Sequence, residues 1–345
     1  MFYSNSNLTI FVNYLAKTKM KDIKIVKIMS ELGAGTRGAS LGYDALWIAS
    51  LNAKKTNVLD ENEDDPHTFF KNIETIEVET ENQLLMEGTT TKYAKYIHGI
   101  QKVYNNISAS LQTVVKEGSF PLLISGAHST AGGTIKGLAE AYPNKRIGVV
   151  WIDAHADIHS PYTTPSGNVH GMPLATALKL DNDRFQLDNR NIDNETVKVW
   201  SEICGETPRV KTEDVVYFAV RDTEREEDEI IEQLGIKNYT VEEIRRRGPK
   251  TCVNETLESL SQCDLIYISF DVDSMDSMIS KGTGTPVLNG MTQVEAEKVL
   301  FYLFESEKIA CFEMVEINPT LDNECNKMAE TAFSILQKVA KMIKK

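Results

Sequence analysis

Six strand-length runs of apolar residues recur along this chain, separated by amphipathic stretches. The runs cover residues 23–29, 120–126, 146–153, 214–220, 264–270 and 309–316. Each is nearly continuous in valine, isoleucine, leucine and aromatic residues, which is typical of strands that helices cover on both faces. The pattern therefore predicts an α/β fold in which a mainly parallel sheet lies between two helical layers.

Helix-length stretches lie between and after these runs. We expect helices at residues 91–117, 129–141, 224–234, 253–260, 293–307 and 323–345. Regular alternation without a repeat or a linker predicts a single three-layer α/β/α domain over residues 22–345. Residues 1–21 are poorly patterned and are expected to form an N-terminal extension. The polar insertion Asp181–Asn194 has two open placements, at the mouth of an active site or at a subunit contact.

The acidic composition limits the partners of this protein. With 37 Lys and Arg against 50 Asp and Glu, the net charge is −13, which disfavours a nucleic-acid-binding surface. No apolar run approaches the roughly 20 residues that span a bilayer. Residues 8–16 lack the flanking features of a signal peptide. We therefore expect a cytoplasmic protein that binds neither membrane nor nucleic acid.

The cysteines support the same compartment. They are odd in number, widely spaced and form no CxxC pair, which excludes a zinc ribbon and a disulfide framework. We expect reduced structural thiols at Cys204, Cys252, Cys263, Cys311 and Cys325.

Residues able to bind metals follow four of the strand-like runs. In open parallel sheets, ligands bind beyond the carboxyl ends of the strands. The residues expected there are His128, Asp153, His155, Asp157, Asp271, Asp273 and Glu316. Because alternate residues of an extended segment point to one side, Asp153, His155 and Asp157 are expected to face the same site.

Charge balance indicates what this cluster binds. Four aspartates at one sheet edge repel one another unless cations compensate them, and two divalent ions cancel four negative charges. Imidazole nitrogens mixed with carboxylate oxygens favour Mn²⁺, Zn²⁺, Fe²⁺ or Co²⁺ over Ca²⁺ and Mg²⁺. Taken singly, each residue could be a hydrogen-bonded loop histidine or a solvated acidic turn, but their convergence favours a metal site.

Several sequence blocks resemble the signatures of the ureohydrolase superfamily, and most of all its arginase branch. The blocks read ELGAGTRGASLGYDAL, SGAHS, WIDAHADIHSPYTTPSGNVHG, SFDVDSMD followed by TGTP, and EINP. They occur in the expected order over about residues 22–340. The resemblance implies an arginase-like fold, a small guanidino substrate and a homo-oligomer, either a trimer or a hexamer.

The resemblance also implies two Mn²⁺ ions per chain. One ion is expected to bind His128, Asp153, Asp157 and Asp271. The other is expected to bind His155, Asp153, Asp271 and Asp273. A hydroxide bridging the two ions would attack the guanidinium carbon and release urea and an amine. Ala127 stands where the family usually has Asp, so we expect a weaker site for the first ion.

Three residues resemble the family's catalytic groups. Glu316 is expected to pair with the guanidinium, for which a carboxylate has suitable bidentate geometry. Asp157 is expected to pass a proton to the leaving nitrogen. His170 is expected to shuttle protons to solvent, a task that suits an imidazole.

The remaining matched positions concern the substrate. Four residues match family positions that hold the substrate's α-carboxylate, namely His159, Thr164, Ser166 and Asn168. Three acids match a wall that faces the α-amino group, namely Asp222, Glu224 and Glu227. Thr285 completes the substrate-binding set. This set favours hydrolysis of L-arginine to L-ornithine and urea.

Two of these positions depart from the family pattern and leave alternatives open. His159 replaces an Asn, and Glu224 replaces an Asp. The same chemistry on agmatine, guanidinobutyrate or a formiminoglutamate-like compound is one alternative. A catalytically inactive binding or regulatory protein is the other, against which the complete set of metal-ligand positions argues.

Overall fold

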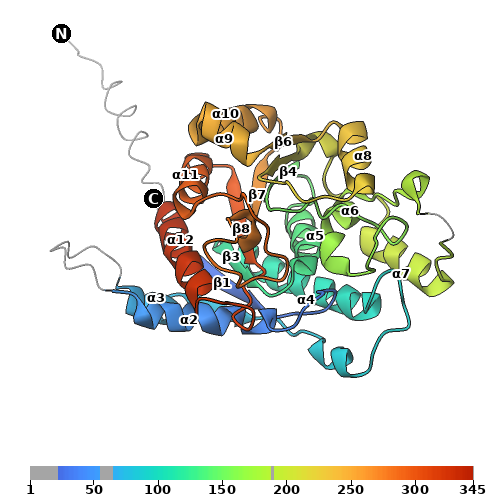
Figure 1. Ribbon diagram of the computed structural model, residues 1–345, viewed down its shortest axis with the longest axis horizontal. Helices are drawn as coiled ribbons and strands as arrows, with labels where there is room; N and C mark the ends of the chain where they lie inside the picture. The colour runs from blue at the N-terminus through green and yellow to red at the C-terminus, as the bar shows by residue number, and fades with distance from the viewer. Residues whose placement is uncertain (1–21, 55–64, 188–189, 345) are drawn as a thin grey trace, which may run out of the picture.

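The computed structural model describes residues 22–54, 65–187 and 190–344 (Figure 1). The extension predicted at residues 1–21, including the segment 8–16, lies outside the described residues. The strands are β1 (Ile23–Ile28), β2 (Glu74–Glu77), β3 (Phe120–Ser125), β4 (Ile147–Ile152), β5 (Val215–Phe218), β6 (Lys237–Tyr239), β7 (Leu265–Asp271) and β8 (Ile309–Val315). They form one eight-stranded sheet in the order β2-β1-β3-β8-β7-β4-β5-β6. Every pairing is parallel, which confirms the predicted sheet.

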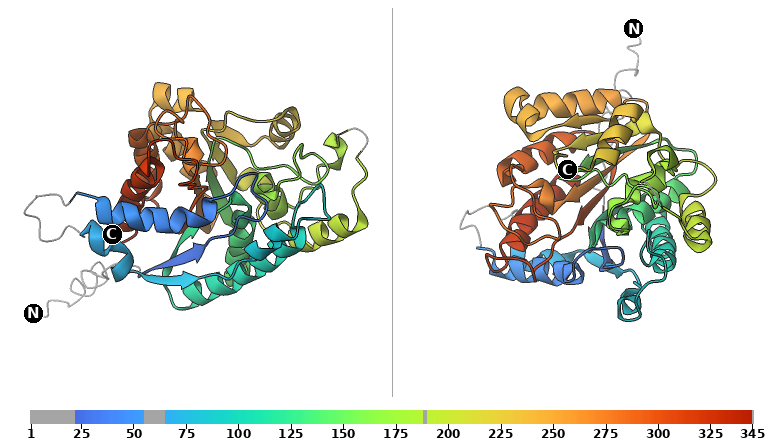
Figure 2. Two further views of the ribbon diagram at one scale, coloured as in Figure 1. Left: turned by 60° about the horizontal axis from the view of Figure 1, so that its bottom comes forward. Right: turned by 45° about the vertical axis from the view of Figure 1, so that its right-hand side comes forward.

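Helices flank the sheet on both sides (Figures 1 and 2). They are α2 (Gly42–Asn52), α3 (Phe69–Asn72), α4 (Ile97–Lys116), α5 (Ala131–Ala141), α6 (Pro173–Leu178), α7 (Asn194–Cys204), α8 (Arg225–Leu234), α9 (Val241–Arg247), α10 (Pro249–Ser259), α11 (Gln293–Leu303) and α12 (Lys327–Ile343). In the described ranges, no helix is long and apolar enough to cross a membrane.

Alternate residues of the central strands face two separate hydrophobic cores. In β4, Val150 and Ile152 belong to a core that α2 and α9–α12 complete. Their neighbours Val149 and Trp151 belong to a second core, which α4–α7 complete. Since successive side chains of a strand point to opposite faces, continuous apolar runs become the middle layer between two helical layers. The predicted three-layer α/β/α architecture is confirmed.

The sequence patterns miss the two edge strands, β2 and β6. Both are short, and their residues are largely exposed or only half-buried. A strand covered on one side has little need of a continuous apolar run, so it lacks the signal that reveals the central strands. Helices α2, α3, α6, α7 and α9 were also not predicted. Helix α10 was predicted, but it begins four residues before its expected start.

The first predicted helix begins later than expected, at Ile97 rather than residue 91. Residues 91–96 instead form turns, and Tyr96 has a left-handed backbone with φ 59°. The last helix begins at Lys327 rather than residue 323, after Cys325, whose φ is 67°. All five cysteines are free as predicted; four are buried, but Cys325 is exposed and therefore not a core thiol.

Candidate metal centre

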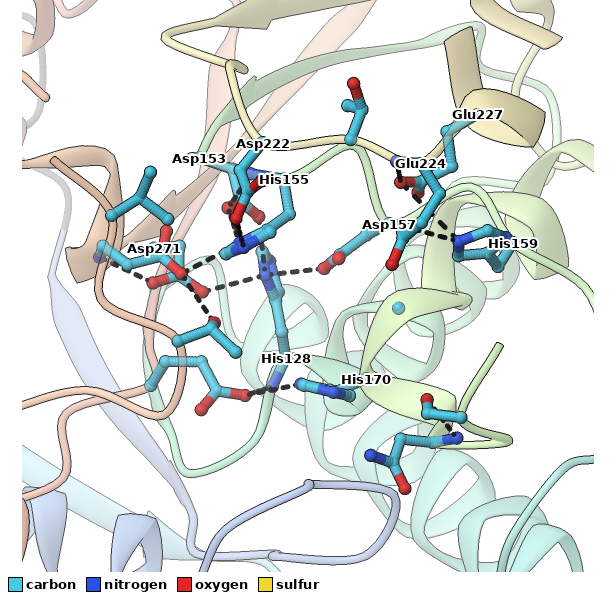
Figure 3. Close-up of a pocket in the computed structure, with 18 of the residues that line it drawn as sticks. His128, Asp153, His155, Asp157, His159, His170, Asp222, Glu224, Glu227 and Asp271 are labelled. Carbon is cyan, nitrogen blue, oxygen red and sulfur yellow. Dashed lines mark hydrogen bonds and ion pairs between the residues drawn. The ribbon is translucent and has the colours of Figure 1, made fainter. Parts of the chain in front are cut away.

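The carboxyl ends of β3, β8, β7, β4 and β5 lie side by side in the sheet, and the loops after them surround one pocket of about 540 Å³ (Figure 3). All sixteen residues singled out from the sequence line this pocket. The strand order therefore brings together groups that are up to 188 positions apart in the chain, such as His128 and Glu316. Sequence reasoning did not single out the other lining residues, which are Pro165, Gly171, Thr223, Pro286 and Val287.

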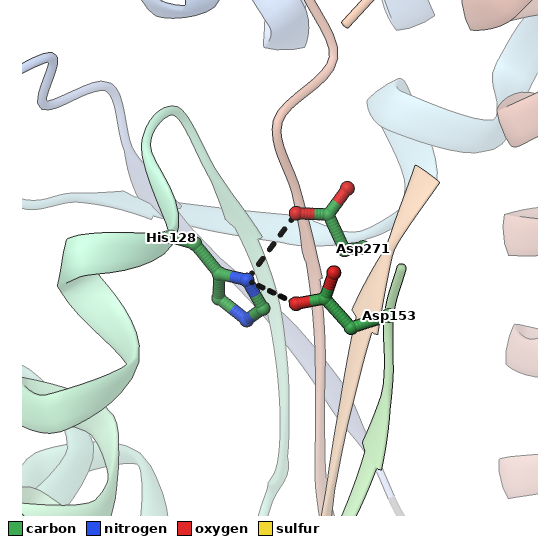
Figure 4. Close-up of side chains that lie close together, drawn as sticks. All are labelled: His128, Asp153 and Asp271. Carbon is green, nitrogen blue, oxygen red and sulfur yellow. Dashed lines mark ion pairs between the residues drawn. The ribbon is translucent and has the colours of Figure 1, made fainter. Parts of the chain in front are cut away.

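His128 is surrounded by three carboxylates. Its Nδ1 lies 3.1 Å from Asp153 Oδ2, 3.0 Å from Asp157 Oδ2 and 3.2 Å from Asp271 Oδ2. Figure 4 shows two of these contacts. Although Nδ1 is buried, no hydrogen bond satisfies it. A nitrogen and three oxygens that converge in this way form a donor set for a divalent cation.

The opposite edge of the His128 ring has a partner. Its Nε2 lies 2.7 Å from Ser269 Oγ, and the ring stacks on Trp151 with centroids 4.2 Å apart. If Nε2 carries the proton for this bond, Nδ1 presents its lone pair to the carboxylates. The methyl side chain of Ala127 cannot hydrogen-bond to the ring, so Ser269 and Trp151 fix the ring orientation.

His155 forms a second cluster beside the first. Its Nδ1 lies 3.1 Å from Asp273 Oδ2 and 3.5 Å from Asp153 Oδ1. Its Nε2 lies 3.6 Å from Asp222 Oδ2 at the outer side of the pocket. Asp153 thus belongs to both clusters, which is the arrangement expected of a ligand that bridges two ions.

Backbone and indole N–H groups hold the buried carboxylates in place. Asp153 accepts from the Trp151 indole over 3.0 Å and from the His155 amide over 2.8 Å. Asp271 accepts from the amide of Asp273 over 2.8 Å. Since each carboxylate has several lone pairs, these bonds fix its orientation and leave capacity for a further ligand.

The electrostatics favour positive charge at this centre. Burial together with the charge of Asp153 raises the pKa of Asp273 to about 6. Burial and the charges of Asp273 and Asp153 raise the pKa of Asp271 well above its ordinary value. Burial opposes charging of His128, yet the surrounding carboxylates raise its pKa well above normal. Bound cations would relieve this repulsion, so the residues present fit a metal pair.

Glu316 and Asp157 both adopt left-handed backbone conformations, with φ of 65° and 51°. Such values are uncommon for residues other than glycine and concentrate at functional sites. Glu316 Oε1 accepts from the His128 amide over 2.7 Å and lies 3.8 Å from His170 Nδ1. Burial alone would lower the pKa of His170, but Glu316 raises it.

The two positions that depart from the family pattern are in contact. His159 Nε2 lies 3.1 Å from Glu224 Oε2 (Figure 3). Its Nδ1 lies 3.0 Å from Thr163 Oγ1. Glu224 caps α8 and forms a capping box with Glu227. The hydrogen bond with His159 lowers the pKa of Glu224 to about 2. Burial, reinforced by Glu224, raises the pKa of Glu227 well above normal.

Thr285 contacts an acid of the metal centre. Its hydroxyl donates to Asp273 Oδ2 over 3.1 Å, while the residue also lines the pocket. The loop carrying Asp273 is tied to the loop after β5 by Arg221, which donates to carbonyl oxygens of Asp273, Val287 and Leu288. Sequence reasoning missed this role of Arg221, because backbone acceptors leave no motif.

The described part of the insertion Asp181–Asn194 is hydrogen-bonded to the loop after β4. Asn182 Nδ2 donates to the carbonyl of Ile158 over 2.9 Å, and the Leu187 amide donates to that of Tyr162 over 3.2 Å. Arg190 donates to the carbonyl of Pro161 over 3.1 Å. These contacts attach the insertion to the loop that carries His159 and Thr164, and its placement at the active-site mouth or at a subunit contact stays a prediction.

A parallel α/β sheet whose carboxyl ends bring two imidazoles and four aspartates into one pocket defines a metal-dependent hydrolase. A family model described as "Arginase family" matches residues 21–341. The chain belongs to the arginase family, and it is accordingly a metal-dependent ureohydrolase.

Individual relatives agree with this assignment. An arginase from Bacillus caldovelox is 32% identical over 318 residues, which cover 92% of this chain and 97% of that protein. An arginase from Bacillus subtilis is 31% identical, with the same coverage of both chains. A crystal structure of the Bacillus caldovelox arginase superposes with a TM-score of 0.74 at 30% identity, covering 93% of this chain and 98% of that one.

Proposed function

We propose that this protein hydrolyses L-arginine to L-ornithine and urea with two Mn²⁺ ions per chain. The proposal rests on one observation, which is the division of the outer pocket into two segments of opposite character. We call residues 164–168 the donor segment and residues 222–227 the acid segment. The acid segment contributes Asp222, Glu224 and Glu227 to the pocket lining.

The donor segment offers unused hydrogen-bond protons. The Thr164 hydroxyl accepts from the Gly167 amide over 3.0 Å, and the Ser166 hydroxyl accepts from the Asn168 amide over 3.1 Å. A hydroxyl that accepts a bond keeps its own proton to donate. The donor segment therefore suits a carboxylate and the acid segment suits an ammonium group, and arginine carries both at the end remote from its guanidinium.

We propose that the metal ligands are the six residues of the two clusters, with Asp153 and Asp271 shared. Bound there, divalent cations supply Lewis-acid activation of water near neutral pH. The donor set of imidazole and carboxylate supports manganese among the transition metals. Metal identity and stoichiometry belong to this proposal. They are supported by the unsatisfied Nδ1 of His128 and by the four clustered aspartates.

The chain's own residues are assigned to binding and proton transfer. Glu316 accepts the guanidinium in bidentate fashion and so orients its carbon toward the metal clusters. Asp157 delivers a proton to the departing nitrogen. His170, whose side chain is 22% exposed beside Glu316, exchanges that proton with solvent. Thr285 acts by holding Asp273 rather than by binding the remote end of the substrate.

The wider setting of the enzyme is also proposed. The free thiols support a cytoplasmic location, and we expect residues 22–345 to act as one catalytic domain. Family membership supports a homo-oligomer, either a trimer or a hexamer. The acidic net charge supports a small-molecule substrate rather than a nucleic acid.

The other substrates fit the two segments less well. Agmatine lacks the carboxylate that the donor segment would bind, and guanidinobutyrate lacks the ammonium group that the acid segment would bind. An inactive binding protein would not need the strained backbone at Glu316 and Asp157, which costs about 1–3 kcal/mol per residue.

An assay of urea release from a panel of guanidino compounds, with formamide release measured for formiminoglutamate, tests the proposal. We expect L-arginine to have a kcat/KM at least about tenfold above that of agmatine, guanidinobutyrate or formiminoglutamate, because each lost charge removes a favourable contact. Activity should require added Mn²⁺ after chelation. Faster hydrolysis of another member would refute arginine as the substrate.

A further inference from the structure

A positively charged side chain lies directly behind the donor segment. Lys95 is half-buried, and its Nζ donates to Asn168 Oδ1 over 3.0 Å. Asn168 lines the pocket, whereas Lys95 does not. The positive charge of Lys95 is therefore separated from the pocket by the side-chain amide of Asn168.

The backbone fixes Lys95 in this position. The Lys95 amide donates to the carbonyl of Gly167 over 2.8 Å. Gly167 has φ +75°, and a Cβ there would lie only 2.0 Å from the carbonyl oxygen of Lys92. Only glycine permits such a close approach in this conformation. The segment 91–96 is thus docked on the donor segment by its main chain, which holds Lys95 beside Asn168.

Lys95 dictates which face the Asn168 amide presents. An ammonium group can only donate, so it selects the amide oxygen and leaves the Nδ2 protons for other acceptors. Gly35 leaves room for this arrangement, since a Cβ there would come within 3.0 Å of Asn168 Nδ2. In the flipped amide, the Nδ2 protons would face the Lys95 ammonium group, which cannot accept them.

No carboxylate of the described residues lies within 4.0 Å of Lys95 Nζ. This is unexpected in a chain with 50 acidic and 37 basic residues. Half-buried charges are usually paired, because burial without a counter-charge costs free energy. A carboxylate bound by the donor segment would supply the missing negative charge.

We propose that Lys95 is a specificity-determining residue that selects substrates with a carboxylate at the end remote from the guanidinium. This inference rests on the proposed function of the donor segment. Lys95 is a positioning residue, since it acts by orienting Asn168 and by adding positive charge behind it. The reacting carbon lies at the opposite end of the substrate, so Lys95 should influence binding much more than turnover.

Two matched ligands and two matched lysines test the proposal. L-arginine and L-argininamide have nearly the same shape but differ in the negative charge at the remote end. Lys95→Met and Lys92→Met remove the same charge, but Lys92 is exposed and, within the part of the chain that the structure describes, its Nζ contacts Tyr93 alone. We expect Lys95→Met to raise the KM for L-arginine about tenfold, the usual size of a lost charge-assisted contact.

The other measurements separate charge from support of the loop. With Lys95→Met, kcat for L-arginine and KM for L-argininamide should stay within about twofold of wild type. Lys95→Arg should restore most of the affinity for L-arginine, and Lys92→Met should leave the KM for both ligands unchanged. Raising the salt concentration should weaken L-arginine binding more in the wild type than in Lys95→Met. If Lys95→Met raised the KM equally for both ligands, or raised it for neither, the proposal would be overturned.

Failure of the proposed function can be told apart from failure of this inference. If the wild type prefers guanidinobutyrate to L-arginine, the proposed function is wrong. The same variants are then compared on guanidinobutyrate and its amide. A preference for the acid that is lost in Lys95→Met would still support the role of Lys95, and an unchanged preference would reject it.

Discussion

His159 and Glu224 show how two unusual residues can compensate each other. Each departs from the family pattern, and the sequence alone presented them as separate reasons to doubt the substrate. In the structure they form one hydrogen-bonded pair at the pocket mouth, with the imidazole side chain 6% exposed and the carboxylate 51% exposed. The longer side chain of Glu224 reaches the larger side chain of His159, so the two departures from the family pattern are better regarded as one coupled substitution.

A double-mutant cycle tests this pairing. His159→Asn and Glu224→Asp should each lower kcat/KM for L-arginine about three- to tenfold, because each leaves its partner without a matched contact. In the double variant, the loss in kcat/KM, expressed as a free energy, should be smaller than the sum of the two single losses. The difference, which is the coupling free energy, should be about 0.5–1 kcal/mol, because Glu224 is half exposed to solvent. Strict additivity would mean that the two residues act independently.

Residues within recognisable blocks were predictable from the sequence, and those that act by position were not. The sixteen predicted residues fall after strands or in motif segments, where their chemistry is visible. Ser269 lies inside the apolar run of β7, and its polarity there was the only available signal of a partner for His128. Lys95 gave no signal, because its importance depends on the approach of two loops.

At the scale of elements, glycines of α5 allow it to pack closely against α4. A Cβ added at Gly133 would lie 2.9 Å from the Cα of Tyr104 and 2.9 Å from Ile107 Cδ1. Because one of these atoms belongs to the backbone, the helices would have to separate. Helix α5 follows the loop of His128 directly, so this packing also supports the metal centre.

Gly133→Ala should therefore destabilise the protein although alanine favours helices. We expect overpacking to cost about 1–3 kcal/mol, which exceeds the gain of about 1 kcal/mol in helix propensity. Urea unfolding followed by circular dichroism measures the change. Ala139→Gly, at a half-buried position of the same helix, serves as the control for propensity alone. A more stable Gly133→Ala variant would contradict the packing argument.

The chain's elements were only partly predictable for a physical reason. Central strands are covered on both faces and carry continuous apolar runs, so all six were found. Helix α7 carries a helical apolar period at Val199, Trp200 and Ile203 and was predictable from it. The edge strands β2 and β6 and the helix α2 have mixed patterns that short windows do not distinguish from loops. Their existence depends on the neighbours they pack against, which the sequence does not display locally.

At the scale of the whole molecule, the order of strands creates the site. Strands β8 and β7 come late in the chain but lie between β3 and β4 in the sheet. This insertion places Asp271 and Glu316 beside His128 and Asp153. Local patterns could not reveal the strand order, so the convergence of these residues was expected only from their places after strands, from charge balance and from the resemblance.

The central claim is that the clustered aspartates and histidines hold two divalent cations. Calorimetric titration of the chelator-treated chain with Mn²⁺ tests it most directly. We predict two ions per chain in the wild type and in His170→Ala, which should retain its metal while losing turnover. Asp271→Asn should bind fewer ions, since we propose that this carboxylate binds both of them. A wild-type chain that binds less than one ion, and releases no urea from L-arginine in excess Mn²⁺, would contradict the account.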